Sequence, residues 1–323
     1  MVTVGSLIQW FTDKGNECLV NKADFSTQIV KPWTIGEATS EHISFIGPKH
    51  KGKLLSTLNA TNCRIVIIDS QLLTDEIRND LPNQISFVIS DNPKVDLIAV
   101  CKAKFPINSE IEGIHPSASV SEQATVGSNV KIGAFAVIEK GAIIGDGCNI
   151  GVGTHIKGNV TLKTNVLIGS NTVLGGVGFG YSKDDISGNH HQFPHYGGVI
   201  IGNDVSVGAN TCIDRGSLSN TIIHDGVKID NLVHIAHNVI IGKNTLIIAL
   251  SMIGGSAIIG EDCWVAPSSC IRNGVSVGDN TTVGLATTVT KNVESNKTVV
   301  GSPAMDLEDY LILRKRLKEL MDS

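Results

Sequence analysis

Two clusters of histidine contain the side chains of this chain that are best suited to chemistry. His234 and His237 lie in the segment His-Ile-Ala-His-Asn, and His190, His191 and His195 lie in a glycine-rich stretch. An imidazole titrates close to neutral pH, so it can act as a general base, and it is also a common metal ligand. The clusters therefore indicate acid–base catalysis or a metal site, against the ordinary alternatives of exposed rings and a solvated loop.

A repeat of six residues organises the part of the chain that must position these histidines. Aliphatic residues recur every sixth position from Ile114 to Leu174, from Ile201 to Ile213 and from Ile223 to Val289. This period fits neither an α-helix nor a flat strand. It predicts a parallel β-helix in which three short faces make one coil, Gly or Asn takes the corners, and residues 18 apart stack at about 4.8 Å.

Two interruptions of the repeat are candidates for function, because long insertions on a rigid scaffold often carry it. They are residues 175–198, which hold the second histidine cluster, and residues 214–222. In the register of the repeat Ile235 points inward, so His237 is expected to face outward near a corner.

The flanks of the repeat differ from it in pattern. Residues 1–105 are expected to form a small α/β domain, residues 106–300 the β-helix with its insertion at 175–198, and residues 301–323 a terminal helix. The small domain is predicted to contain helices at Val4–Phe11 and Pro93–Lys104 and strands at Ile43–Ile46, Arg64–Ile68 and Ile85–Ile89.

The terminal helix is predicted at Asp306–Met321, with Asp306 as its N-cap. Its cations form either a solvated face or a landing site for an acidic carrier protein or a phosphate-bearing donor. They are Arg314, Lys315, Arg316 and Lys318.

Composition excludes several classes of protein. The formal charge of −5 argues against a nucleic-acid partner, and no apolar run is long enough to span a membrane. Neither a signal peptide nor a disulfide framework is indicated, since the seven cysteines are widely spaced and form no C-x-x-C pair. We therefore expect a cytoplasmic protein with reduced cysteines.

Several segments resemble one family closely. The sequences GFGY (178–181), VGANTCIDRGSL (207–218), VKIDN (227–231) and IAHNVIIG (235–242) are similar to those of the UDP-3-O-acyl-glucosamine N-acyltransferases of lipid A synthesis. The resemblance covers most of the chain and implies a left-handed prism, mainly β, that forms a homotrimer. It also implies transfer of an acyl group from a thioester to the amine of a nucleotide-linked amino sugar, with no bound cofactor and with acyl-CoA or acyl carrier protein as co-substrate.

The resemblance also assigns roles to residues. It implies that His237 is the general base, that Asp230 orients its imidazole, and that the N–H of Gly255, one coil above, stabilises the oxyanion. The same resemblance and the histidine clusters suggest further residues as substrate contacts. They are Phe45, Tyr181, His191, His195, His234 and Asn238.

Three departures from the family pattern bear on the substrate. Arg272–Gly274 replaces a second histidine, Ile248–Leu250 places larger side chains along the acyl groove, and Phe45–His50 shortens a motif of the small domain. These departures favour a short (hydroxy)acyl-CoA donor and a UDP- or dTDP-amino sugar destined for a surface polysaccharide.

Three other interpretations remain open from the sequence. The first is the lipid A enzyme itself. The second is a metal hydratase of the γ-carbonic anhydrase type, with ligands drawn from both histidine clusters of adjacent chains. The third is a structural or ice-binding solenoid, which would need regular outward rows of threonine.

Overall fold

A computed structural model describes residues 1–21, 24–106, 111–301 and 307–322, with side chains in the last helix from residue 311 onward. The chain divides into two compact units, residues 1–109 and 110–323, each of which is described by itself. The predicted helix cap Asp306 lies outside the described residues.

The first unit is a five-stranded sheet with helices. The strand order is β1 (Cys18–Leu19), β5 (Ser86–Ser90), β4 (Ile65–Asp69), β3 (His42–Ile46) and β2 (Lys31–Pro32), with only β1 antiparallel. The helices are α1 (Val4–Thr12), α2 (Leu54–Ala60), α3 (Asp75–Asn79) and α4 (Pro93–Lys104), with 3-10 turns at Pro48–His50 and Ser70–Leu72. The helices and strands predicted here are confirmed to within two residues. The central strands β4 and β5 are buried throughout, as expected for strands covered on both faces.

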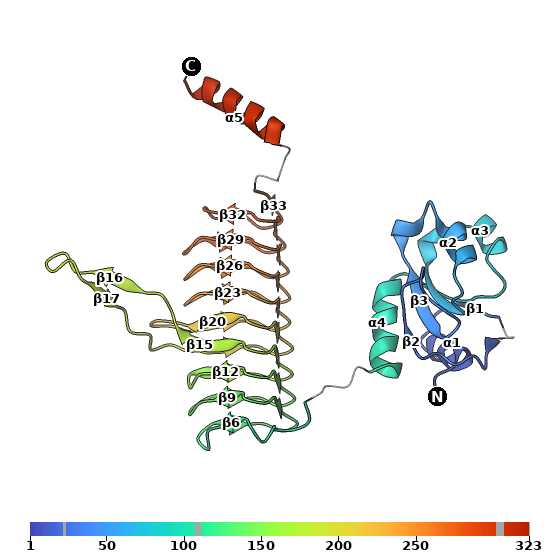
Figure 1. Cartoon of the computed structure of the whole chain (residues 1–323), viewed down its shortest axis with the longest axis horizontal. Helices are drawn as coiled ribbons and strands as arrows, with labels where there is room; N and C mark the ends of the chain where they lie inside the picture. The colour runs from blue at the N-terminus through green and yellow to red at the C-terminus, as the bar shows by residue number, and fades with distance from the viewer. Residues whose placement is uncertain (22–23, 107–110, 302–306, 323) are drawn as a thin grey trace. The chain divides into compact units, whose positions relative to one another are not determined.

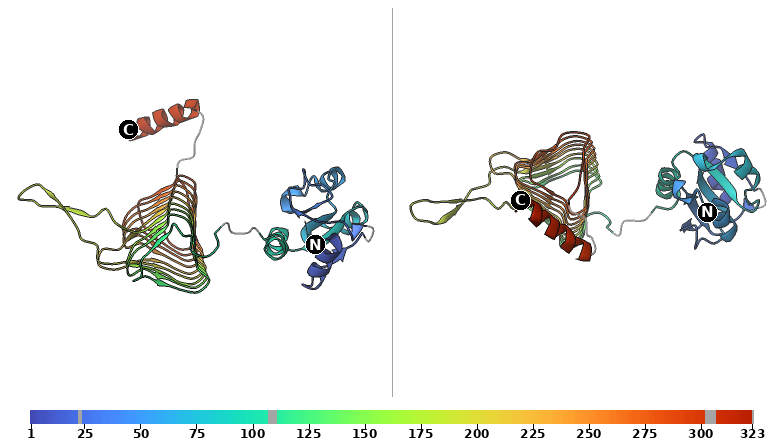
Figure 2. Two further views of the ribbon diagram at one scale, coloured as in Figure 1. Left: turned by 60° about the horizontal axis from the view of Figure 1, so that its bottom comes forward. Right: turned by 90° about the horizontal axis from the view of Figure 1, so that it is seen from above.

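The second unit is a triangular prism of parallel strands, and the predicted left-handed β-helix is confirmed (Figures 1 and 2). Most strands contain two residues, of which the second points into the core. Ile229 pairs with Ile247 and Ile241 with Ile259, so one coil takes 18 residues. The inward aliphatic residues form one continuous core along the prism.

Three sheets make the three faces of the prism. The first sheet contains β7 (Thr125–Val126), β10 (Ile143–Ile144), β13 (Val160–Leu162), β18 (Val199–Ile201), β21 (Thr221–Ile223), β24 (Ile240–Ile241), β27 (Ile258–Ile259) and β30 (Ser276–Val277). The second contains β8 (Lys131–Ile132), β11 (Asn149–Ile150), β14 (Leu167–Ile168), β19 (Ser206–Val207), β22 (Lys228–Ile229), β25 (Leu246–Ile247), β28 (Trp264–Val265), β31 (Thr282–Val283) and β33 (Thr298–Val299). The third contains β6 (Ser119–Val120), β9 (Val137–Ile138), β12 (His155–Ile156), β15 (Val173–Val177), β20 (Cys212–Arg215), β23 (His234–Ile235), β26 (Met252–Ile253), β29 (Cys270–Ile271) and β32 (Thr288–Val289).

The corners of the prism need left-handed backbone conformations. Asn takes many of them, as predicted, and Asn238 is one, with φ of 63°. Leu232 and Leu250 also have positive φ, at 58° and 63°. The corner geometry is therefore imposed by the stacked coils rather than by glycine alone.

The insertion at 175–198 forms an arm on this scaffold. Its strands β16 (Tyr181–Lys183) and β17 (His190–Gln192) pair in an antiparallel hairpin that leaves the prism beside β15 and β20 (Figure 1). The ladder continues across the insertion, because Leu174 pairs with Ile213. The segment between β20 and β21 lengthens the next coil, so that Ile213 pairs with Ile235.

The chain ends in α5 (Leu307–Met321), whose described side chains are exposed. Within the described ranges, no helix combines the length and apolar character that a membrane span requires.

Candidate active site

The hydrogen bonds around His237 indicate which ring nitrogen carries the proton. Its Nδ1 lies 2.9 Å from Oδ1 of Asn238. That oxygen also accepts hydrogen bonds from the backbone N–H and the hydroxyl of Ser217, while the amide nitrogen of Asn238 donates to Ser219. Because Asn238 presents an acceptor, Nδ1 of His237 carries the proton. Nε2 therefore keeps its lone pair, as a general base must.

Two glycines leave the space that the ring of His237 occupies. A methyl group on Gly255 would lie 2.8 Å from Nε2 of His237, and one on Gly178 would lie 2.9 Å from its Cβ. Ordinary van der Waals contacts begin near 3.4 Å. Neither position tolerates a side chain without movement, so the glycines permit the close approach of backbone to ring. The N–H of Gly255 donates no hydrogen bond to any described residue.

A second histidine, His195, packs against the ring of His237. The rings of His195 and His237 meet edge to face, with centroids 5.4 Å apart. His195 is only 8% exposed, and its Nδ1 donates to the carbonyl of Phe193 at 2.8 Å. Its Nε2 is buried and has no hydrogen-bond partner among the described residues. The insertion thus places one imidazole against another.

Asp214 is the carboxylate of this cluster, and the sequence analysis gave it no role. Its side chain is 14% exposed, and Oδ2 lies 3.7 Å from Nε2 of His234. Burial raises the pKa of Asp214, and the charges of His234, His237 and His195 oppose that rise. No described residue donates a hydrogen bond to its carboxylate, which lines an open cavity.

A cavity of about 540 Å³ opens in front of these groups. It is lined by Phe179, Asp214, His234, Ala236, His237, Met252, Gly254, Gly255, Ser256, Asn273 and Gly274. Asn273 occupies the region in which the family pattern has its second histidine. The cavity combines an imidazole nitrogen with a lone pair, an N–H with no partner among the described residues and a carboxylate, and these groups suit transfer of an acyl group to an amine.

Within one chain Asp230 does not reach His237, and its orienting role stays a prediction. Its carboxylate accepts from the N–H groups of Asn231 and Ala249, at 2.7 and 3.2 Å. It follows β22 on the second sheet, whereas His237 follows β23 on the third. The two positions are seven residues apart, more than the six-residue repeat of one face, so they belong to different corners. Asn238 takes over the bond to Nδ1 of His237.

The other predicted substrate contacts divide between the site and its surroundings. His195 packs against His237, and His234 lies beside Asp214. Asn238 forms hydrogen bonds within the corner, to Ser217 among others. His191 and Tyr181 lie on the exposed hairpin, where Tyr181 packs against Phe179. Phe45 is partly buried against the core of the small domain, which favours its structural interpretation.

The residues expected to fill the acyl groove do not narrow this cavity. Ile248 lies in a separate groove beside Lys228 and Asp230. Leu250 projects from a corner and is 60% exposed. Within one chain, therefore, the argument from Ile248–Leu250 for a short acyl group has no support.

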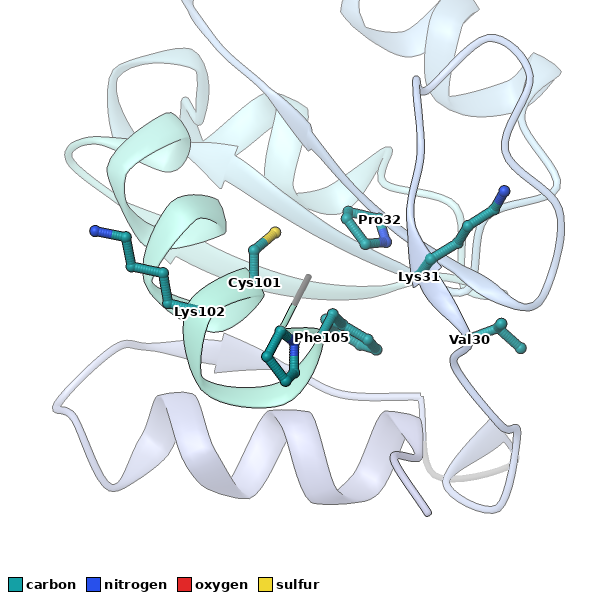
Figure 3. A pocket seen from close by; sticks show the side chains of 7 residues that line it. Val30, Lys31, Pro32, Cys101, Lys102 and Phe105 are labelled. Atoms are coloured by element: carbon teal, nitrogen blue, oxygen red, sulfur yellow. The ribbon is translucent and has the colours of Figure 1, made fainter. Parts of the chain in front are cut away.

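A further cavity of about 700 Å³ lies in the small domain (Figure 3). It is lined by Val30, Lys31, Pro32, Cys101, Lys102, Phe105 and Pro106. These side chains include two cations but neither a histidine nor a carboxylate, so acid–base chemistry is not indicated there. Over the described ranges, no group of three or more His, Cys, Asp or Glu side chains is arranged to hold a metal ion.

Comparison with known proteins supports the family resemblance. The family of bacterial transferase hexapeptide repeats (six repeats) matches residues 220–255. UDP-3-O-acylglucosamine N-acyltransferase 2 of Legionella pneumophila (strain Paris) is 43% identical over 133 residues, which cover 41% of this chain and 38% of that protein. UDP-3-O-acylglucosamine N-acyltransferase of Bordetella avium (strain 197N) is 46% identical over 121 residues, covering 37% and 34%. The matched segments thus span less than half of either relative.

Solved structures share the fold. UDP-N-acetylglucosamine acyltransferase from Campylobacter jejuni aligns with a TM-score of 0.51 at 23% identity, over 65% of this chain and 85% of that one. UDP-N-acetylglucosamine O-acyltransferase from Moraxella catarrhalis aligns with a TM-score of 0.52 at 22% identity, over 62% and 77%. The chain therefore contains hexapeptide repeats, and its β-helix is similar in sequence to part of the UDP-3-O-acylglucosamine N-acyltransferases.

Proposed function

We propose that the chain is an N-acyltransferase that moves an acyl group from a thioester to the amine of UDP-3-O-acylglucosamine. The observation that carries the proposal is the lone pair on Nε2 of His237, fixed by Asn238, in a ring edge that lies against Gly255 beside the cavity. The names of the matched relatives support this acceptor. The proposal extends to the whole chain an activity that is named for proteins matched over part of their length.

In this mechanism Nε2 of His237 removes a proton from the amine as its nitrogen attacks the thioester carbonyl. The N–H of Gly255 is suited to stabilise the oxyanion that forms there. The imidazolium then returns its proton to the departing thiolate. No covalent acyl-enzyme is needed, so no cysteine acts as a nucleophile.

The matched relatives change the choice of acceptor. The sequence favoured a surface-polysaccharide sugar and a short acyl-CoA, but the relatives carry the names of the alternative, the lipid A enzyme. The groove residues that favoured a short donor lie outside the cavity. A long acyl group on a carrier protein is therefore the donor we propose, within a homotrimer.

The test is release of free thiol by the purified full-length protein. We expect turnover with UDP-3-O-acylglucosamine and a hydroxyacyl carrier protein, and much less with short acyl-CoA or dTDP-amino sugars. His237→Ala should reduce turnover by roughly 10²- to 10⁴-fold, the contribution of a general base. His224→Ala, an exposed histidine on another face, is the matched control. Unchanged turnover in His237→Ala would refute the assignment of His237 as the general base. Turnover only with short acyl-CoA would favour the surface-polysaccharide acceptor instead.

A further inference from the structure

The Asp214 end of the cavity has a negative charge without a permanent partner. Among the described residues no Lys or Arg lies within ion-pair distance of its carboxylate, and the one contact of that kind is His234 at 3.7 Å. The neighbouring Arg215 does not satisfy it, and its own Nε is buried without a described partner. A carboxylate that is 14% exposed with no hydrogen-bond donor leaves room for a cation that is also a donor.

The described ionisable groups around Asp214 are histidines, which are not permanent cations. The titratable side chains that face it are His234 and His237 from the third sheet and His195 from the insertion. The ring of His237 presents a lone pair on Nε2, and the Nδ1 proton of His195 is engaged by Phe193. Two acceptors, a carboxylate and an imine nitrogen, thus line the same cavity.

We propose that Asp214 binds the acceptor as its ammonium ion and places the amine beside His237. An amino sugar presents a primary ammonium with one positive charge and three N–H donors, which matches the carboxylate and the lone pair. The inference rests on the proposed function, because it names how that site selects an amine over a hydroxyl group.

The proton balance follows from this placement. The bound ammonium must lose one proton before its nitrogen can attack, and Asp214 is the carboxylate in position to receive it. The proton that leaves nitrogen as the C–N bond forms goes to Nε2 of His237 and from there to the thiolate. The proton on Asp214 passes to water after product release, so the reaction of an ammonium with a thioester yields an amide, a thiol and one proton.

The experiment compares binding of UDP-glucosamine and UDP-glucose, which differ only in an amine or a hydroxyl group on the sugar, by isothermal titration. We expect the wild-type protein to prefer UDP-glucosamine by about 10- to 100-fold, the value of a hydrogen bond to a charged group. Asp214→Asn keeps the shape of the side chain and should abolish the preference. Asp185→Asn, at the exposed hairpin, is the control for loss of one negative charge.

The pH dependence separates binding from a structural role. The preference for UDP-glucosamine should fall in acid, as Asp214 is protonated, and in alkali, as the ligand amine loses its charge. Asp214→Asn should lack the acid limb. A preference that survives in Asp214→Asn would overturn the inference, as would a wild-type protein that binds both ligands equally. Thiol release by the wild-type protein tests the acyl transfer separately, so either proposal can fail while the other stands.

Discussion

Replacing Gly255 by alanine would test whether the approach of this backbone to His237 matters for activity. The added methyl group would lie 2.8 Å from both Nε2 and Cε1 of His237, where ordinary contacts begin near 3.4 Å. Gly255 does not have positive φ, so alanine introduces no backbone strain. Alanine also keeps the backbone N–H, and the substitution therefore isolates displacement of the base from loss of the oxyanion donor.

The ring of His237 has little room to move away. His195 packs edge-on against it at 5.4 Å between centroids, and the backbone of Gly178 lies close to its Cβ. Nε2 must therefore shift by about 0.6 Å or rotate. Misplacement of a catalytic group by about 1 Å can cost on the order of 10²-fold in rate, so we expect kcat/KM to fall by about 10- to 100-fold.

The assay is thiol release under subsaturating acceptor, with thermal unfolding measured in parallel. Gly52→Ala is the matched control, because nothing lies within 4 Å of the added methyl group there. A Gly255→Ala protein that folds normally and keeps the wild-type kcat/KM would refute the assigned position of the base.

Three other predictions concern stability and assembly. Asn238→Ala should lower the free energy of unfolding in urea by about 1–3 kcal/mol, because two partly buried donors of Ser217 lose their acceptor. A loss below this range would mean that the corner does not depend on Asn238. Asp214→Asn should raise the free energy of unfolding at pH 7 but not below about pH 3.8, because burial raises the pKa of this carboxyl and the penalty exists only while it is ionised. Equal melting temperatures of wild type and variant across pH 3–8 would contradict that reasoning. Light scattering of the full chain should give the mass of three copies, as the family resemblance implies. The exposed Ile258, Trp264 and Leu285 on the prism favour an interface between copies, and a single-chain mass would contradict the homotrimer.

The periodic part of the fold was predictable because its cause is local. Each hexad supplies one inward aliphatic residue, and register partners such as Ile241 and Ile259 follow from the period alone. The path of the insertion is not periodic. The contact between His195 and His237 depends on two glycines and on the carbonyl of Phe193, which no short-range pattern specifies.

The sequence analysis named Asp230 as the carboxylate near His237, whereas the structure places Asp214 there. This difference also follows from the path of the chain. Asp230 is close to His237 in sequence, but the prism assigns neighbours by coil and not by distance along the chain. The longer coil after β20 pairs Ile213 with Ile235, so Asp214 lies one coil below Ala236 and next to His237. Counting the register across the second interruption identifies this residue from the sequence.

The corner at Asn238 joins stability and chemistry in one residue. Its left-handed conformation closes the coil, its amide anchors the segment at Ser217–Ser219, and the same amide oxygen fixes the tautomer of His237. Asp214 has the opposite effect on stability, because its partly buried charge lowers stability, and its one described ion-pair contact is His234 at 3.7 Å. The regular coils of the prism offset the stability that the charge of Asp214 costs. The site lies where the repeat is interrupted, and the coils on both sides of it remain regular.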